Sequence, residues 1–146
     1  MWEYMDPQDK QDQELLHGGL TRKIIGCALE VINDLGSGFL ESVYEKALTV
    51  ALSDAGVPFE TQKPIGVRFR GRSVGDYIAD LVVEDKVIVE LKAVTSITRE
   101  HEAQIINYLN ATGIEVGLII NFGKPKLEFK RFTRTPKNKT KHGYTG

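Results

Sequence analysis

Two acidic residues and one lysine lie in two apolar runs that flank a short charged turn, Glu84-Asp85-Lys86. Asp80, Glu90 and Lys92 lie within residues 77–93, which otherwise consist largely of Val, Ile, Leu and Ala. Carboxylate oxygens suit Mg²⁺, and a lysine beside the ion can orient a water and stabilise negative charge. Such a metal supports phosphodiester hydrolysis. The pattern D-x9-E-x-K therefore indicates either this chemistry or a buried salt-bridge network.

The three residues are predicted to share one face of a β-hairpin. A turn centred on Asp85 places Asp80 directly opposite Glu90. Side chains alternate along a strand, so Glu90 and Lys92 point to the same side. We expect their face to carry Ile78, Val82 and Ile88, and the other face to carry Tyr77, Ala79, Leu81, Val83, Val87, Val89 and Leu91. Two carboxylates on a covered face lose hydration and repel each other, unless a cation or a proton compensates.

Three helices and six strands are predicted around this hairpin. Apolar residues at helical spacing indicate helices at residues 21–35, 40–55 and 99–112. Thr21 and Thr98 are expected as N-caps, and Gly36 as a left-handed residue after the first helix. Strands are expected at residues 57–62, 65–70, 77–83, 87–93, 116–121 and 127–132. This order predicts an α/β fold with a mixed central sheet flanked by helices.

Length and composition indicate one ordinary globular domain. The chain has 146 residues, is 41% hydrophobic and has a formal net charge of -1. Its single cysteine, Cys27, excludes a disulfide framework or a multi-cysteine zinc site and is predicted to lie in the core. No signal peptide or membrane-spanning run is recognisable, so we expect a cytoplasmic protein with no membrane partner.

Charge divides the chain into three parts. Residues 1–17 form a polar, acidic lead-in, residues 18–133 form the domain, and residues 134–146 form a basic tail that is expected to be disordered. Basic residues also occur in the last predicted strand and just before it. Lys126, Lys130 and Arg131 are therefore candidates for binding an anionic substrate.

Two further motifs strengthen the case for nuclease chemistry. Residues 38–44 read G-x-x-E-x-x-Y and place Glu41 and Tyr44 three positions apart on a helix, while Gln104 and Tyr108 lie four apart on another. Together with the acidic hairpin, these motifs resemble the GxxExxY proteins, a family within the PD-(D/E)XK nuclease superfamily. The resemblance extends over roughly residues 20–132. It implies a restriction-endonuclease-like αβββαβ core and DNA cleavage that depends on Mg²⁺ or Mn²⁺.

The resemblance also assigns roles to individual residues. Asp80, Glu90, Glu41 and the backbone carbonyl of Leu91 would bind the metal, and Lys92 would be the catalytic lysine. Gln104 and Tyr108 would contact the substrate, and Tyr44 is either a substrate contact or a core residue. Glu45 and His101 are weaker candidates, because solvated helix positions explain both.

Other functions are compatible with the same residues. A module that binds nucleic acid or a protein partner could keep the fold without catalysis, and a structural oligomer could use the buried charges only for specificity. The presence of Asp80, Glu90 and Lys92 together favours the nuclease. A homodimer is possible, and DNA is the favoured substrate over RNA.

Overall fold

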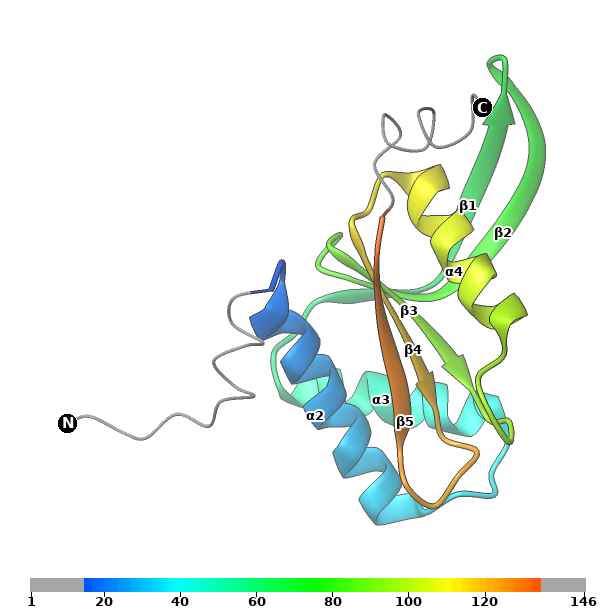
Figure 1. Ribbon diagram of the computed structural model, residues 1–146. Coiled ribbons are helices and arrows are strands. Elements are labelled where there is room, and N and C mark those ends of the chain that lie inside the picture. The colour runs from blue at the N-terminus through cyan, green and yellow to red at the C-terminus, as the bar shows by residue number, and fades with distance from the viewer. Residues whose placement is uncertain (1–14, 135–146) are drawn as a thin grey trace.

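The computed structural model describes residues 15–134, which form three helices and a five-stranded sheet (Figure 1). The elements are α2 (Gly18–Leu35), α3 (Glu41–Asp54), β1 (Phe59–Phe69), β2 (Arg72–Val83), β3 (Val87–Lys92), α4 (Arg99–Thr112), β4 (Val116–Asn121) and β5 (Glu128–Thr133). Most of the predicted lead-in and nearly all of the predicted basic tail lie outside the described residues. No helix within 15–134 is both long and apolar enough to cross a membrane.

The sheet is mixed, as predicted. Its strand order is β1-β2-β3-β4-β5, and only β3 and β4 run parallel. Parallel neighbours need a crossover connection, which α4 provides. From α3 to β4 the elements follow the predicted order αβββαβ, with α2 added before it and β5 after it.

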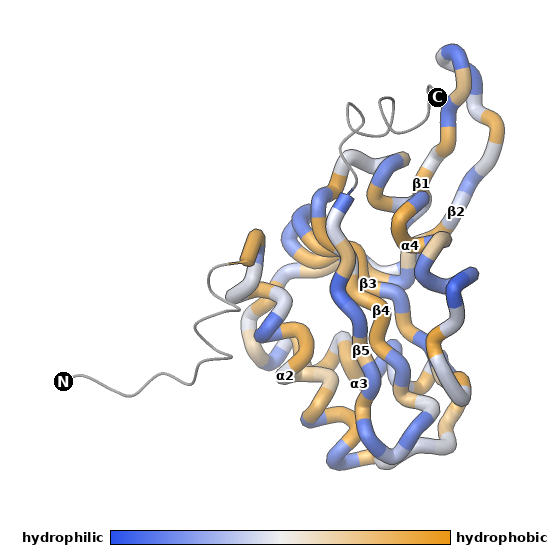
Figure 2. The backbone as a smooth tube through the Cα atoms, in the orientation of Figure 1, coloured by the Kyte–Doolittle hydropathy of each residue, from blue (hydrophilic) through white to orange (hydrophobic). Residues whose placement is uncertain are grey.

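Helices cover both faces of the sheet. On one face, α2 and α3 pack through Ile24, Leu48 and Leu52 against strand residues such as Leu81, Val89 and Leu118. On the other, α4 packs through Tyr108 and Leu109 against Val82 and Ile88. Figure 2 shows the resulting hydrophobic colouring of β3 and β4. Every residue of β3 except Lys92 is buried, as are Leu81, Val82 and Val83 of β2. This part of the predicted hairpin is covered on both sides, whereas Tyr77 and Ile78 are exposed.

The first helix begins earlier than predicted. It starts at Gly18, and His17 precedes it in a left-handed conformation. Thr21 is not the N-cap, because its hydroxyl donates to the Gly18 carbonyl 3.1 Å away inside the helix. Gly36 ends the helix with φ of 72° but with ψ of 178°, so it has a positive φ without being left-handed helical. Cys27 is buried, as expected.

The two strands predicted at 57–62 and 65–70 are one strand, β1. Pro64 lies inside it, opposite Ile78 of β2. Proline is tolerated here because β1 is an edge strand and the missing N–H need not serve a second neighbour. The strand predicted at 77–83 is β2, and it begins five residues earlier than predicted, at Arg72. β1 and β2 therefore form a long hairpin.

Two loop predictions are confirmed. Thr98 caps α4: its hydroxyl accepts a hydrogen bond from the His101 backbone N–H at 3.2 Å. The His101 imidazole Nδ1 accepts one from the Thr98 N–H at 3.0 Å, so this histidine completes the cap. Gly113 follows the helix with φ of 77°.

Candidate active site

The ladder between β2 and β3 stops at the predicted acidic pair. Leu81, Val82 and Val83 pair with Val89, Ile88 and Val87, which is the predicted register. At the next position the Asp80 N–H donates to Glu90 Oε2 at 2.9 Å, and the Leu91 N–H donates to Asp80 Oδ2 at 2.8 Å. Each carboxylate thus accepts a backbone N–H where the strands separate. These hydrogen bonds hold the two acidic side chains in place where the strands separate.

The alternation of side chains along β2 breaks at Asp80, contrary to our prediction. Ala79 belongs to the same core cluster as Val82, and Tyr77 packs on Tyr108 of that cluster, whereas Ile78 is 57% exposed. The predicted faces of Tyr77, Ile78 and Ala79 are therefore wrong. The break coincides with an irregularity in β1: Gln62, which lies across from Asp80, has φ of 49°, and this pair is missing from the ladder.

The Leu91 carbonyl faces the acidic pair. The Lys92 carbonyl accepts a hydrogen bond from the Phe122 N–H at 2.8 Å, so Lys92 pairs toward β4. Backbone groups of successive strand residues point to opposite sides, and the Leu91 N–H does point to Asp80. The C=O of a strand residue points the same way as its N–H. The Leu91 carbonyl therefore points to the same side of β3 as the N–H that binds Asp80.

The surroundings of Glu90 favour its neutral form. The side chain is only 6% exposed. Burial and the Asp80 charge raise its pKa from 4.5 to about 8, and Glu41 adds to the effect. The Asp80 N–H and Lys92 act in the opposite direction without cancelling it. The prediction that crowding raises the pKa of at least one acid is confirmed.

Glu41 approaches this pair from the N-terminus of α3. Partial desolvation and the Asp80 charge raise its pKa, whereas Lys92 lowers it. Glu45, one turn further, accepts a hydrogen bond from Gln62 at 2.8 Å. However, no three acidic, histidine or cysteine side chains within residues 15–134 converge closely enough to form a metal cluster. Glu41 is an electrostatic neighbour of the acidic pair in this structure.

The donor set of the pair nevertheless fits a hard divalent cation. Oxygens Oδ1 of Asp80 and Oε1 of Glu90 accept no hydrogen bond from the described residues, because the bonds above use Oδ2 and Oε2. Two carboxylates and one carbonyl leave positions open for water, as Mg²⁺ requires.

Helix α4 closes one side of the site with Tyr108 and Gln104. Tyr108 is 4% exposed, and its ring packs edge-on against Tyr77 with centroids 4.9 Å apart. Burial and the Glu90 charge raise its pKa to about 12, although a hydrogen bond with Gln104 opposes the change. The structure therefore brings the predicted Gln104–Tyr108 pair next to the acids.

The predicted basic residues divide between the two faces of the sheet. Ile119 of β4 pairs with Glu90 on one side and with Lys130 on the other, so Lys130 lies two strand spacings, about 10 Å, from Glu90. The Lys130 ammonium forms an ion pair with Glu102 of α4 at 2.6 Å. Arg131 lies on the opposite face and donates to the Leu16 carbonyl. Lys126 is exposed in the loop before β5. Of the three residues, Lys130 is aligned with the acidic pair and Arg131 is not.

Tyr44 is a core residue. It is fully buried, its ring stacks on Phe122 at 4.6 Å, and its hydroxyl donates to the Gly36 carbonyl at 2.6 Å. The same hydroxyl accepts the Phe39 N–H at 3.1 Å. Its prediction as a substrate contact is therefore wrong, because the ring and hydroxyl are used in holding the loop between α2 and α3.

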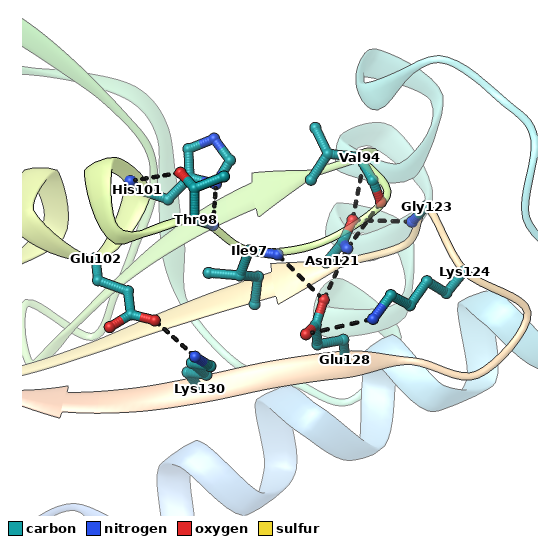
Figure 3. Close-up of polar contacts among 10 residues, drawn as sticks. All are labelled: Val94, Ile97, Thr98, His101, Glu102, Asn121, Gly123, Lys124, Glu128 and Lys130. Carbon is teal, nitrogen blue, oxygen red and sulfur yellow. Dashed lines mark hydrogen bonds and ion pairs between the residues drawn. The ribbon is translucent and has the colours of Figure 1, made fainter.

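A polar cluster that sequence reasoning missed holds the end of β3 (Figure 3). Asn121 is fully buried and lies opposite Lys92. Its side chain accepts the Val94 N–H and donates to the Val94 carbonyl, both at 2.9 Å, and it also donates to Glu128 at 3.0 Å. The hydrogen bond from Asn121 is the largest cause of the lowered pKa of Glu128. The loop that follows Lys92 is thereby fastened to β4.

Close backbone approach completes this attachment. The Gly123 N–H donates to Asn121 Oδ1 at 2.9 Å, and a Cβ at Gly123 would lie 2.0 Å from the Val94 carbonyl oxygen. Only glycine fits there. The sequence signal was an asparagine ending a buried apolar strand and followed by Phe-Gly, which does not by itself reveal a partner 27 residues away.

Comparison with known proteins identifies the family. A family model of the PD-(D/E)XK nuclease superfamily matches residues 19–132. No curated protein matches the chain. The fold is similar to the crystal structure of SSO0001, with a TM-score of 0.52 and 13% identity over 92% of this chain. This chain spans only 65% of SSO0001, and the similarity concerns the fold alone. Because the family match extends from α2 to β5 and includes the acidic hairpin, the chain belongs to the PD-(D/E)XK nuclease superfamily.

Proposed function

We propose that this protein is a Mg²⁺- or Mn²⁺-dependent nuclease that hydrolyses phosphodiester bonds in DNA, and that it belongs to the GxxExxY branch of its superfamily. The observation that carries the proposal is the interlocked pair Asp80 and Glu90 at the point where β2 and β3 separate. A purely structural acid pair would be matched by nearby cations. Here Glu90 keeps a strongly raised pKa although Lys92 is close.

The chain's own residues supply distinct functions in this proposal. Asp80, Glu90 and the Leu91 carbonyl would hold the metal, which when bound would activate a water and neutralise charge on the phosphate. Lys92 would orient the attacking water or stabilise the phosphate charge from the same face of β3. Glu41 would contribute from α3. Gln104 would contact the nucleic acid from α4, held by Tyr108.

The decisive experiment is a cleavage assay on a substrate panel. The protein is incubated with linear, nicked, circular and single-stranded DNA and with RNA, in Mg²⁺, Mn²⁺ or chelator. We expect cleavage of at least one DNA substrate in Mg²⁺ or Mn²⁺ and none in chelator. Cleavage of RNA alone would correct the substrate, and cleavage that persists in chelator would refute the metal dependence.

A matched pair of lysine variants tests the site. Lys92→Ala should abolish cleavage while Mn²⁺ affinity, measured by calorimetry, changes little. Lys86→Ala, in the exposed turn between β2 and β3, removes the same charge away from the site and should cleave normally. Wild-type cleavage by Lys92→Ala would refute the assignment. A folded wild type that binds DNA but never cleaves it would favour a non-catalytic binding module.

A further inference from the structure

The hairpin of β1 and β2 extends well beyond the rest of the sheet. β3 pairs with β2 only at Leu81–Val83, so residues 72–79 of β2 have β1 as their sole strand neighbour. Figure 1 shows this part curving away from the central strands. At the tip, Arg70 and Gly71 have φ of 52° and 77°, which is the two-residue turn that matches strand twist. A register shift at Val67 and Arg68 adds further twist.

The tip of this hairpin carries only positive charge. Between residues 61 and 75 there are four cations and no acid, and three of the cations, Arg68, Arg70 and Arg72, lie around the turn. Figure 2 shows hydrophilic residues at this tip. Phe69 is 59% exposed and Val74 is 61% exposed. The tip is therefore an arginine cluster mixed with uncovered apolar side chains.

Two of these arginines are available to bind a ligand. Arg68 donates to the Gly71 carbonyl at 2.9 Å and thereby holds the turn. Arg70 lies over the Phe69 ring at 4.9 Å, an arrangement that leaves the edge of the guanidinium free for hydrogen bonds. The Arg72 side chain makes no ion pair or hydrogen bond with any residue between 15 and 134. An exposed arginine without a carboxylate partner suits phosphate oxygens.

The root of the hairpin is joined directly to the candidate active site. Tyr77 of β2 packs on Tyr108 of α4, and Ile65 of β1 belongs to the same cluster as Tyr108. Arg72 lies eight positions before Asp80 on β2, which corresponds to about 26 Å along a strand. This is the length of about eight base pairs of duplex at 3.4 Å each.

We propose that the β1–β2 hairpin is an arm that binds the phosphate backbone of the DNA substrate, through Arg70 and Arg72, about eight base pairs from the bond that is cut. This inference rests on the proposed nuclease function and adds a binding site remote from the acidic pair. Charge complementarity selects nucleic acid as the partner, because the tip is wholly basic while the whole chain has a net charge of -1. Contacts of this kind position the enzyme without reading sequence.

A second copy of this chain is the competing occupant. The free edge of β2 could pair with another strand, and charged residues at such an edge also prevent unwanted pairing. The two occupants give different results. DNA binding through arginines releases counterions and depends steeply on salt, whereas strand pairing changes the oligomeric state.

The test compares a double variant with a charge-matched control. Arg70→Gln with Arg72→Gln removes two cations at the tip, and Lys23→Gln with Lys86→Gln removes two exposed cations from α2 and the β2–β3 turn. Binding of a fluorescein-labelled 30-base-pair DNA duplex is measured with Ca²⁺ in place of Mg²⁺, from 50 to 300 mM salt. A hairpin duplex of about 6 base pairs, which is shorter than the span from Arg72 to Asp80, serves as the short substrate. Sedimentation velocity reports the oligomeric state.

We expect the double variant to bind the long duplex up to about 60-fold more weakly at 0.1 M salt, with the slope of log affinity against log salt reduced by about 1.8. The short duplex should be less affected, and the control should keep the wild-type slope. The proposed arm would be wrong if the double variant cleaves like wild type and keeps the wild-type slope of log affinity against log salt. It would also be wrong if the double variant changes the oligomeric state without changing that slope. If the wild type neither binds nor cuts any DNA, the proposed function fails first.

Discussion

Replacing Glu90 by glutamine should make the metal-free protein more stable at alkaline pH and leave it unchanged at acidic pH. The folded protein holds the Glu90 proton up to a pKa of about 8, whereas the unfolded chain releases it near 4.5. Between these values the native state binds more protons, so the free energy of unfolding falls as pH rises. The stability that the native state gains by retaining the Glu90 proton is fully present below about pH 4.5 and is lost by about pH 8.

The size of the effect follows from the same two values. Each pKa unit corresponds to about 1.4 kcal/mol, so a rise from 4.5 to about 8 sets an upper limit of about 5 kcal/mol. The amide of glutamine is neutral at every pH, and its oxygen can still accept the Asp80 N–H. The variant should therefore match wild type near pH 4.5 and exceed it by about 2 to 5 kcal/mol near pH 8.5.

Urea unfolding followed by circular dichroism, in chelator and at several pH values, measures this difference. Glu115→Gln, an exposed acid outside the site, is the control and should follow wild type throughout. Adding Mg²⁺ should restore stability to wild type at alkaline pH but not to Glu90→Gln, because the ion binds only the folded site. Parallel stability curves for wild type and Glu90→Gln would show that Glu90 is ionised in the apo protein, and our account of the site would be wrong.

Three further predictions concern residues around the site. Asn121→Ala should lower the free energy of unfolding by about 3 kcal/mol or more, because it leaves backbone groups of Val94 and Gly123 without their partners. A change below about 1 kcal/mol in urea titration would contradict this. Gln104→Ala should weaken DNA binding and leave Mn²⁺ affinity intact, while the exposed Asn107→Ala on the same helix should change neither; equal DNA affinity for the two variants would remove Gln104 from the substrate site. Deleting residues 134–146 should flatten the dependence of log DNA affinity on log salt by about 0.9 for each phosphate that this segment neutralises, and an unchanged slope would show that the basic segment does not bind the DNA.

Local rules were sufficient for much of the fold. The register of β2 and β3 followed from a short polar turn between two apolar runs, because alternation and a central Asp85 leave few pairings. Thr98 and Gly113 marked the ends of α4 correctly, since caps depend on residues within one turn of the helix. These features involve interactions between neighbours in sequence, which composition and spacing can report.

Tertiary structure decided the details that give the site its geometry. The break in alternation at Asp80 lies where β1 is irregular as well, because Gln62 has a positive φ and does not pair with Asp80. The exchange of hydrogen bonds between Asp80, Glu90 and Leu91 exists only because β2 leaves β3 at that position. Spacing along one strand carries no information about where its partner departs.

Long-range contacts were equally invisible in the sequence. In the sequence, Asn121 is an ordinary residue at the end of a predicted strand. In the structure its side chain forms hydrogen bonds with the backbone of Val94, 27 positions earlier. Tyr44 belongs to a motif that suggested chemistry, yet packing against Phe122 places it in the core. Residue types and spacing were enough to predict the architecture and to select two acids and a lysine as candidates for the site. Burial and the pKa of Glu90 arise from the three-dimensional environment, because desolvation and charge proximity depend on segments that only folding brings together.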